Sequence, residues 1–302
     1  MLMMRQFFLI GVLAAASLIA FAWSSGAQEQ KQHDNQFKIP QPGNIQIVTT
    51  SNGSTFIGRI TEIAGDTIVF VTEYGAMSIP ANHIDKIREV PEEFVRNGTY
   101  WFPDPNSTRL FFAPTGRMLR KGDWYFADYY LFFPSVNYGV SSRVSLGGGL
   151  SIFPSGSMKN QIYFFTPKVA LKQSEFVNIS TGALVLKMPG NFDEDVQLIS
   201  VLYMVGTYGS HDRSVTLGLG YGLVDGKAAE RPLVVLGGER RLTRRIALVT
   251  ENWIVPGVDN ALVSLGLRFL GEELSADIAL VNTIGKESIF PGVPYVDFVY
   301  NF

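Results

Sequence analysis

The side chains best suited to hydrolytic chemistry are three histidines, His33, His83 and His211. A serine becomes a good nucleophile only when a neighbouring base, most often histidine, takes its proton. His33 falls in a polar stretch before the first predicted domain, His83 in a small β domain, and His211 in a tight turn between two predicted strands. Because nucleophile and base must lie within hydrogen-bond reach, these positions disfavour a His-based hydrolase. We expect that the protein is not an enzyme.

Metal and cofactor chemistry finds equally little support. The chain has no cysteine, which excludes disulfides, zinc–thiolate sites and thiol catalysis. The acidic loop 191–195 offers oxygens that Ca²⁺ accepts, but its spacing matches no ion-binding loop, and a solvated loop is the favoured interpretation. The glycine runs 147–149 and 218–222 lack the following helix that a phosphate cradle needs. We predict no metal and no cofactor.

A set of charged residues falls on the faces of predicted strands that should point inward. Both signs are present, and buried charges need partners, so we expect them to pair across an enclosed interior. Two interpretations stay open: the charges lock a filled, structural interior, or they line a narrow polar pathway. The set consists of Arg109, Asp128, Lys168, Lys172, Glu239, Arg241, Glu251, Arg268, Asp277 and Asp297.

The elements that must position these charges are long alternating strands between residues 108 and 302. The clearest runs from Arg213 to Leu223, where bulky apolar residues alternate with Ser, Thr and Gly. In a soluble sandwich the second face would carry many charges. A face of small residues instead fits a narrow lumen, with the bulky side chains outside toward lipid.

Twelve such strands are predicted, and an even number fits a closed bacterial barrel. Their connections alternate between tight turns and longer segments, as in outer-membrane barrels, where short turns are periplasmic. The strands lie near 108–115, 123–139, 143–154, 160–172, 175–187, 195–208, 213–224, 230–241, 244–255, 260–270, 274–284 and 294–302. The tight set comprises 140–143, 173–174, 209–212, 242–243 and 271–273; the longer set comprises 115–121, 154–157, 189–193, 225–230, 256–260 and 285–294.

The last predicted strand has one apolar, aromatic face, formed by Val296, Phe298, Tyr300 and Phe302. This pattern resembles the final strand of porin-like bacterial outer-membrane β-barrels, in which a last Phe follows apolar residues at alternate positions. The resemblance covers about two thirds of the chain. It implies that these four residues are a C-terminal insertion signal. It also implies outer-membrane lipid and the barrel-assembly machinery as partners.

Aromatic residues gather at 124–130 and 163–165, where the strands should cross membrane interfaces. Ordinary aromatic core packing is the alternative. The composition supports a β protein, since 46% of residues are apolar and the chain contains 30 Gly. A formal net charge of -2 provides no basic surface for nucleic acid, which we exclude as a partner.

Residues 1–27 have the pattern of a secretory signal peptide: a positive Arg5, an apolar run over 7–22 and small residues at 25–27. An uncleaved inner-membrane anchor is the alternative, although the run is shorter than the roughly 20 residues of a usual span. Any later membrane crossing would require a closed barrel, which satisfies every backbone group internally.

Residues 44–90 contain short strands separated by turns, which predicts a small barrel or meander. The layout of Gly53, Phe56, Gly58 and Ile60 resembles Sm-like small β-barrels. Sm proteins bind RNA, but acidic residues outnumber basic ones across 44–90, which disfavours phosphate binding. We therefore expect an interaction or spacer module with a periplasmic protein as its partner.

The sequence as a whole predicts an all-β protein: an antiparallel up-and-down transmembrane β-barrel of about 12 strands preceded by a small β-barrel or meander domain. The expected segments are a signal peptide (1–27), a linker (28–43), the small periplasmic Sm-like domain (44–90), a second linker (91–107) and the outer-membrane barrel (108–302). The favoured function is a narrow pore or a solute or lipid transit protein. One alternative is a structural barrel that anchors a periplasmic protein- or cell-wall-binding domain; the other is a soluble secreted lipid-binding β protein.

Overall fold

The computed structural model describes residues 37–154, 158–189, 198–224, 226–256, 261–284 and 290–302. The chain divides into two compact units between Trp101 and Phe102, so the segment predicted as the second linker is shared between them. The predicted signal peptide and the acidic loop 191–195 lie outside the described residues. No helix in the described ranges is long and apolar enough to cross a membrane.

The first unit is a five-stranded antiparallel sheet in the order β4-β3-β2-β1-β5, followed by a two-stranded ribbon of β6 and β7. The sheet is a meander whose last strand returns to pair with the first. The elements are β1 (Asn44–Thr50), β2 (Thr55–Ala64), β3 (Thr67–Thr72), β4 (Gly75–Pro80), η1 (Ala81–His83), β5 (Ile84–Pro91), η2 (Glu92–Phe94), β6 (Val95–Arg96) and β7 (Thr99–Tyr100).

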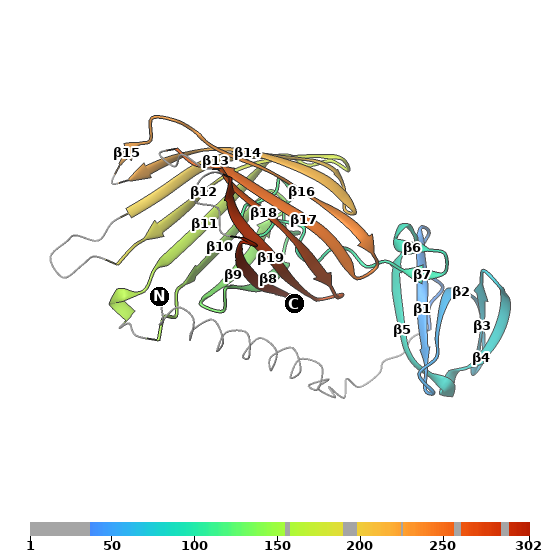
Figure 1. Cartoon of the computed structure of the whole chain (residues 1–302). Helices are drawn as coiled ribbons and strands as arrows, with labels where there is room; N and C mark the ends of the chain where they lie inside the picture. The colour runs from blue at the N-terminus through green and yellow to red at the C-terminus, as the bar shows by residue number, and fades with distance from the viewer. Residues whose placement is uncertain (1–36, 155–157, 190–197, 225, 257–260, 285–289) are drawn as a thin grey trace. The chain divides into compact units, whose positions relative to one another are not determined.

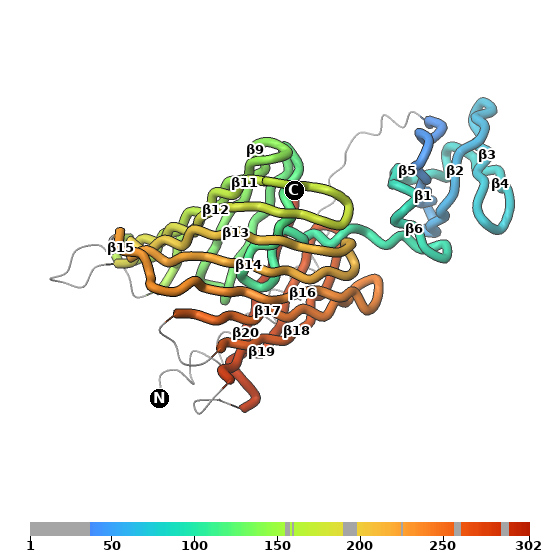
Figure 2. Tube along the Cα trace, turned by 90° about the horizontal axis from the view of Figure 1, so that it is seen from above, coloured from blue at the N-terminus to red at the C-terminus, as the bar shows by residue number. Residues whose placement is uncertain are grey.

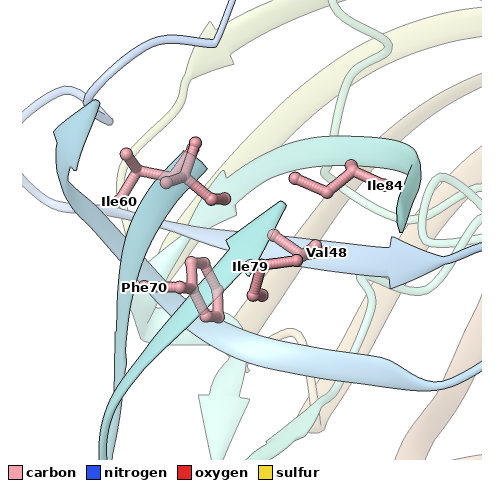
Figure 3. Close-up of a cluster of buried hydrophobic side chains, with 6 residues drawn as sticks. Val48, Ile60, Phe70, Ile79 and Ile84 are labelled. Atoms are coloured by element: carbon pink, nitrogen blue, oxygen red, sulfur yellow. The ribbon is translucent and has the colours of Figure 1, made fainter. Parts of the chain in front are cut away.

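This sheet curves around its own apolar core, drawn in Figure 3. Alternate residues of each strand point into the core, which excludes water from their side chains and stabilises the unit. At Gly58 a Cβ atom would collide with the backbone of Val71, so only glycine allows β2 to approach β3 this closely. The core consists of Val48, Ile60, Ile68, Phe70, Ile79 and Ile84.

The second unit is a closed antiparallel barrel of twelve strands (Figure 1). Each strand pairs with its neighbours in sequence, as β11 to β14 and β16 do side by side in Figure 2, and β20 closes the ring against β8. The elements are β8 (Trp124–Tyr129), β9 (Phe133–Ser141), β10 (Val144–Leu150), η3 (Met158–Asn160), β11 (Tyr163–Lys172), β12 (Val177–Lys187), β13 (Leu198–Ser210), β14 (Arg213–Val224), β16 (Leu233–Thr243), β17 (Ile246–Ile254), β18 (Ala261–Leu270), β19 (Leu274–Ile284) and β20 (Val293–Asn301), with the short β15 (Lys227–Ala228) added to β14.

The predicted number of strands is confirmed, but two of the predicted strands are wrong. Residues 108–115 form no barrel strand and contain only an isolated bridge between Arg109 and Pro114. The stretch predicted as one strand, 123–139, is the hairpin of β8 and β9. Its turn contains Tyr130 and Leu131 with φ angles of 53° and 63°, a conformation that bulky residues rarely adopt.

The alternation of the strands sorts their side chains into an inner and an outer face. In β14, Ser214 and Thr216 are buried inside, whereas Leu217 is 52% exposed and Tyr221 is 50% exposed on the outer face. The connections also alternate around the ring, with tight turns such as 211–212 and longer segments such as 151–162. The barrel therefore has one rim of tight turns and one rim of mostly longer connections, on which the short β8–β9 turn is the exception.

The seam between the first and last barrel strands is closed by an aromatic stack. The rings of Trp124 and Phe302 lie 3.8 Å apart with 3° between their planes. The Phe302 backbone N–H also donates to the Trp124 carbonyl at 3.2 Å. This pair extends the β8–β20 ladder by one residue beyond β20.

We predict that Phe302→Ala lowers the temperature at which the folded barrel unfolds, because aromatic pairs contribute about 0.5–1.5 kcal/mol beyond their buried area. The measurement is the midpoint at which the fast-migrating folded band is lost on a semi-native gel. Phe290→Ala is the matched control, since Phe290 is 95% exposed. Equal midpoints for the two variants would show that the stack does not hold the seam.

Candidate functional site

The interior of the barrel is occupied by the chain's own segment 102–122, here called the plug. This segment precedes β8, and much of it is buried although it forms no strand of the wall. Its buried residues are Phe102, Asp104, Asn106, Arg109, Leu110, Phe111, Ala113, Thr115, Gly116 and Arg117. The lumen is therefore filled by the chain itself over part of its height.

The strongest attachment of the plug is a cluster around Arg268 of β18. Its guanidinium donates to both carboxylate oxygens of Asp277 on β19, each at 2.8 Å, and to Glu239 of β16 at 3.0 Å. On the plug side it reaches Asp104 at 3.2 Å. It also donates to the backbone oxygens of Asn106 and Leu110, at 3.2 and 2.7 Å.

All four charged groups of this cluster are buried, with Arg268 and Asp277 each 0% exposed. The flat fork of an arginine can serve several acceptors at once, and here every one of its nitrogens donates. Removal of one partner from a buried charge group leaves the others without compensation. Arg268 therefore joins three wall strands to the plug in one unit.

A second cluster surrounds Arg109 on the plug. Its Nη1 donates to Asp297 of β20 at 2.7 Å, and its guanidinium lies 4.6 Å from the ring centre of Tyr129. The Tyr295 hydroxyl lies within hydrogen-bond distance of the Phe111 carbonyl, at 2.8 Å, and of the same Asp297 carboxylate, and its one proton is donated to one of these two acceptors at a time. The plug is thereby held against the β8–β20 side of the wall.

A third attachment holds the tip of the plug. One carboxylate oxygen of Glu251 accepts from the backbone N–H groups of Phe112 and Ala113, both at 2.9 Å. Its other oxygen accepts from the Trp253 indole at 2.7 Å. A buried carboxylate that accepts three hydrogen bonds is well compensated, and it replaces the strand partner that this turn of backbone lacks.

The opposite wall binds the later part of the plug through single polar contacts. Lys168 donates to the Arg117 carbonyl at 2.6 Å, and Ser180 donates to the Gly116 carbonyl at 2.6 Å. The Gly116 N–H donates to Thr207 at 2.8 Å. Together with Arg241, which donates to the Phe102 carbonyl at 2.7 Å, these contacts satisfy backbone groups along the plug.

Eight of the ten charges predicted to face the interior belong to this network, and their main partner is the plug rather than the opposite wall. Asp128 is the first exception, because it shares a face with Trp124 and Phe126 and accepts from the Phe133 N–H across the turn. Lys172 is the second, because a register shift after Ala170 turns it to the exposed side.

Sequence reasoning missed the polar residues of the plug, chiefly Asp104, Asn106 and Arg117. The first two were assigned to the linker 91–107 and the third to the long connection 115–121, so no inward face was expected there. The available signal in the sequence was the alternation of Pro103 and Pro105 with Asp104 and Asn106, because a strand of the wall would not contain two prolines so close together. The structure shows that both polar residues are buried.

Beyond the plug lies a cavity of about 190 Å³ inside the barrel. Its wall includes residues near the strand ends that meet the longer connections, such as Phe164 in β11 and Trp253 in β17, and also Ser145, near the tight-turn end of β10. The plug contacts of Thr207 and Arg268 instead lie near the tight-turn ends of β13 and β18. The interior is thus closed by polar contacts at the tight-turn end and hollow toward the other rim.

The candidate residues for metal binding and for hydrolysis can be placed within the described ranges. They contain no cluster of three or more His, Cys, Asp or Glu side chains that could hold a metal ion. His83 lies in η1 of the first unit and His211 in the β13–β14 turn of the barrel, while His33 falls outside the described residues. The two described histidines thus belong to separate compact units.

No protein-family model matches the sequence, and no curated protein matches it. Several solved porins are similar in fold. The KdgM porin in complex with disordered oligogalacturonate is 11% identical, with a TM-score of 0.44 over 60% of this chain and 98% of that chain. The NanC porin is 7% identical, with a TM-score of 0.39 over 59% and 97%.

A loop-deletion mutant of OmpT, an outer membrane protein of Vibrio cholerae, is 11% identical with a TM-score of 0.30 over 86% of this chain and 96% of that chain. At these identities and TM-scores the likeness concerns barrel architecture and assigns no role. The fold and its interior define the class directly: a closed antiparallel β-barrel with an internal plug.

We predict that Arg268→Met destabilises the barrel strongly, because three buried carboxylates lose their shared cation. The breaking of a buried charge pair costs about 3–5 kcal/mol. The measurement is the urea midpoint of the folded band in detergent. Arg268→Lys is the matched variant, which keeps the charge but loses the fork, and its midpoint should fall between those of the wild type and Arg268→Met. A wild-type midpoint for Arg268→Met would contradict the role of this cluster.

Proposed function

We propose that the protein is an outer-membrane transit protein whose pathway is the barrel lumen and whose closed state is held by the plug. The observation that carries this proposal is a hollow interior interrupted by a segment that the wall holds through individual polar contacts. Displacement of the plug would join the cavity to the tight-turn rim. We place that rim on the periplasmic side, in keeping with the short turns of outer-membrane barrels.

The membrane location is supported by the outer face of the barrel. Leu202, Met204, Leu217 and Leu236 are each more than half exposed there, and they belong to neighbouring strands. A soluble monomer rarely exposes a continuous apolar patch of more than a few hundred Å². A band of such residues around the ring fits contact with hydrocarbon. It also disfavours the soluble lipid-binding alternative.

The tip of the plug is the part best suited to move. A single carboxylate oxygen of Glu251 holds the backbone N–H groups of Phe112 and Ala113, and the Phe112 ring adds contacts to the rings of Tyr129 and Trp253. The Arg268 cluster instead holds residues 104–110 through several bonds to buried charges. Phe112 is also 47% exposed and lines the cavity. Movement of this tip would widen the lumen without breaking the Arg268 cluster.

We predict that Glu251→Ala increases the conductance of the protein in planar lipid bilayers or the frequency of its open events. The variant removes the acceptor of two plug N–H groups while the barrel ladder stays intact. Glu175→Ala is the matched control, because Glu175 is an exposed acid in the β11–β12 turn. The wild type and the control should show rare, brief openings.

Silent bilayers for the wild type and for Glu251→Ala would overturn the transit proposal. A large, steady conductance of the wild type would overturn the plug as its gate. Folded migration of each variant on a semi-native gel establishes that the barrel is intact before either result is interpreted.

A second candidate function is a structural barrel that anchors the first unit. The buried Arg268 cluster favours it, because a lumen held this firmly need not open. In that case the first unit is a periplasmic module for a protein or for the cell wall. The strand order β4-β3-β2-β1-β5 supports the proposed likeness to Sm-like folds.

The anchoring candidate predicts that the full chain in detergent retains a cell-envelope protein or peptidoglycan, and that an altered first unit loses it. Phe70→Ala should abolish retention, because large-to-small changes in a core cost about 3–5 kcal/mol. Tyr74→Ala, at a 91% exposed position of the same unit, controls for surface changes. Equal retention by both variants would contradict this function.

A further inference from the structure

We propose that the cavity above the plug binds a small monocarboxylate whose apolar body is about the size of one aromatic ring. This inference rests on the proposed function, because it names the chemical class of the solute that enters the lumen. It is argued from the volume of the cavity, from its lining, and from one buried cation in its wall.

The cavity has the size and lining for a compact apolar body. Its volume of about 190 Å³ is somewhat larger than the ~150 Å³ apolar cavities that accept benzene. Aromatic and aliphatic side chains form most of the wall, including Phe164, Leu184, Val201, Leu233, Val235 and Trp253. Such a wall would favour a ring or a short chain over a sugar, whose hydroxyl groups would lose their hydrogen bonds with water.

Lys168 supplies the charge that selects an acid. Its side chain lines the cavity and is buried, 7% exposed. Among the described residues no carboxylate forms an ion pair with Lys168; its Nζ donates to the carbonyls of Arg117 at 2.6 Å and Thr108 at 3.4 Å. An ammonium group has three donors, so one of them is left for a ligand.

The other buried cations of the wall differ in this respect. Arg268 has three carboxylates, and Arg241 lies 3.6 Å from Asp212. In the plug, Arg109 also lines the cavity but pairs with Asp297 at 2.7 Å, and Arg117 donates to the carbonyls of Gly209 and Ser210 and does not line the cavity. A buried charge without a partner is costly, and a bound anion would remove that cost. The distribution of charge in the lumen therefore points to Lys168 as the place where a carboxylate would sit.

Polar groups around Lys168 could hold the second carboxylate oxygen. Ser145 of β10 lies directly opposite Lys168 in the strand ladder, and Gly182 lies opposite on the other side. The Tyr203 hydroxyl occupies the space above Gly182, where a Cβ would collide with it. Ser145 and Tyr203 both line the same cavity as Lys168, so its wall also offers two hydroxyl groups to a ligand.

The test is isothermal titration of the full protein in detergent with phenylacetate and with its neutral analogue phenylacetamide. The wild type should bind phenylacetate about tenfold or more tightly than the amide, as expected for a hydrogen bond between charged groups in a buried site. Lys168→Gln should lose this preference while it retains a donor for the plug carbonyls. Lys168→Arg should keep it.

Lys172→Gln is the matched control, because Lys172 lies on the same strand but is exposed; it should behave as the wild type. The inference is overturned if the wild type binds neither probe, if it binds both equally, or if folded Lys168→Gln keeps the preference. Bilayer flux separates the two proposals. If phenylacetate binds but does not cross the bilayer through the protein, the transit function alone is contradicted. If phenylacetate and phenylacetamide cross at equal rates, the carboxylate site alone is contradicted.

Discussion

The arrangement of the whole interior depends on the shared guanidinium of Arg268. Without it, Asp104 of the plug and Asp277 and Glu239 of the wall would be three buried negative charges in close proximity. With it, the same groups tie the plug to β16, β18 and β19 in a region from which water is excluded. Electrostatic compensation of this kind requires both partners, so the wall and the plug depend on each other for stability.

The lumen of the barrel offers two different environments along its axis. Toward the tight turns the lumen is filled with charged and polar groups that satisfy the backbone of the plug. Toward the longer connections the wall becomes aromatic and aliphatic around the cavity, with Lys168 near the boundary between the two. A solute that entered from the rim of longer connections would therefore contact the apolar wall of the cavity before it reached the charged groups of the lumen.

The wall could be predicted from the sequence because period-two alternation survives in nearly every strand, and with it the inward direction of seven charges. Arg109, the eighth charge of the network, lies on the plug instead of on a strand. The plug could not, since Leu110, Phe111 and Phe112 have the composition of a strand and alternation does not reveal what covers them. The β8–β9 turn escaped notice because Tyr130 and Leu131 adopt positive φ angles usually reserved for Gly or Asn. The direction of the two remaining charges was predicted wrongly for local reasons. Asp128 accepts a hydrogen bond across the β8–β9 turn, and a register shift turns Lys172 to the outer face.

The plug continues directly from the first unit, with Trp101 in one and Phe102 in the other. Tension applied to the first unit would therefore reach the plug from its amino-terminal end. The Arg241 contact to Phe102 would be stretched first, then the Arg268 cluster, then the Glu251 contact, and the Lys168 and Ser180 contacts to residues 116–117 last. Bonds stretched in series yield one at a time, so the force needed for extraction is set by the strongest single cluster and not by the sum of all contacts.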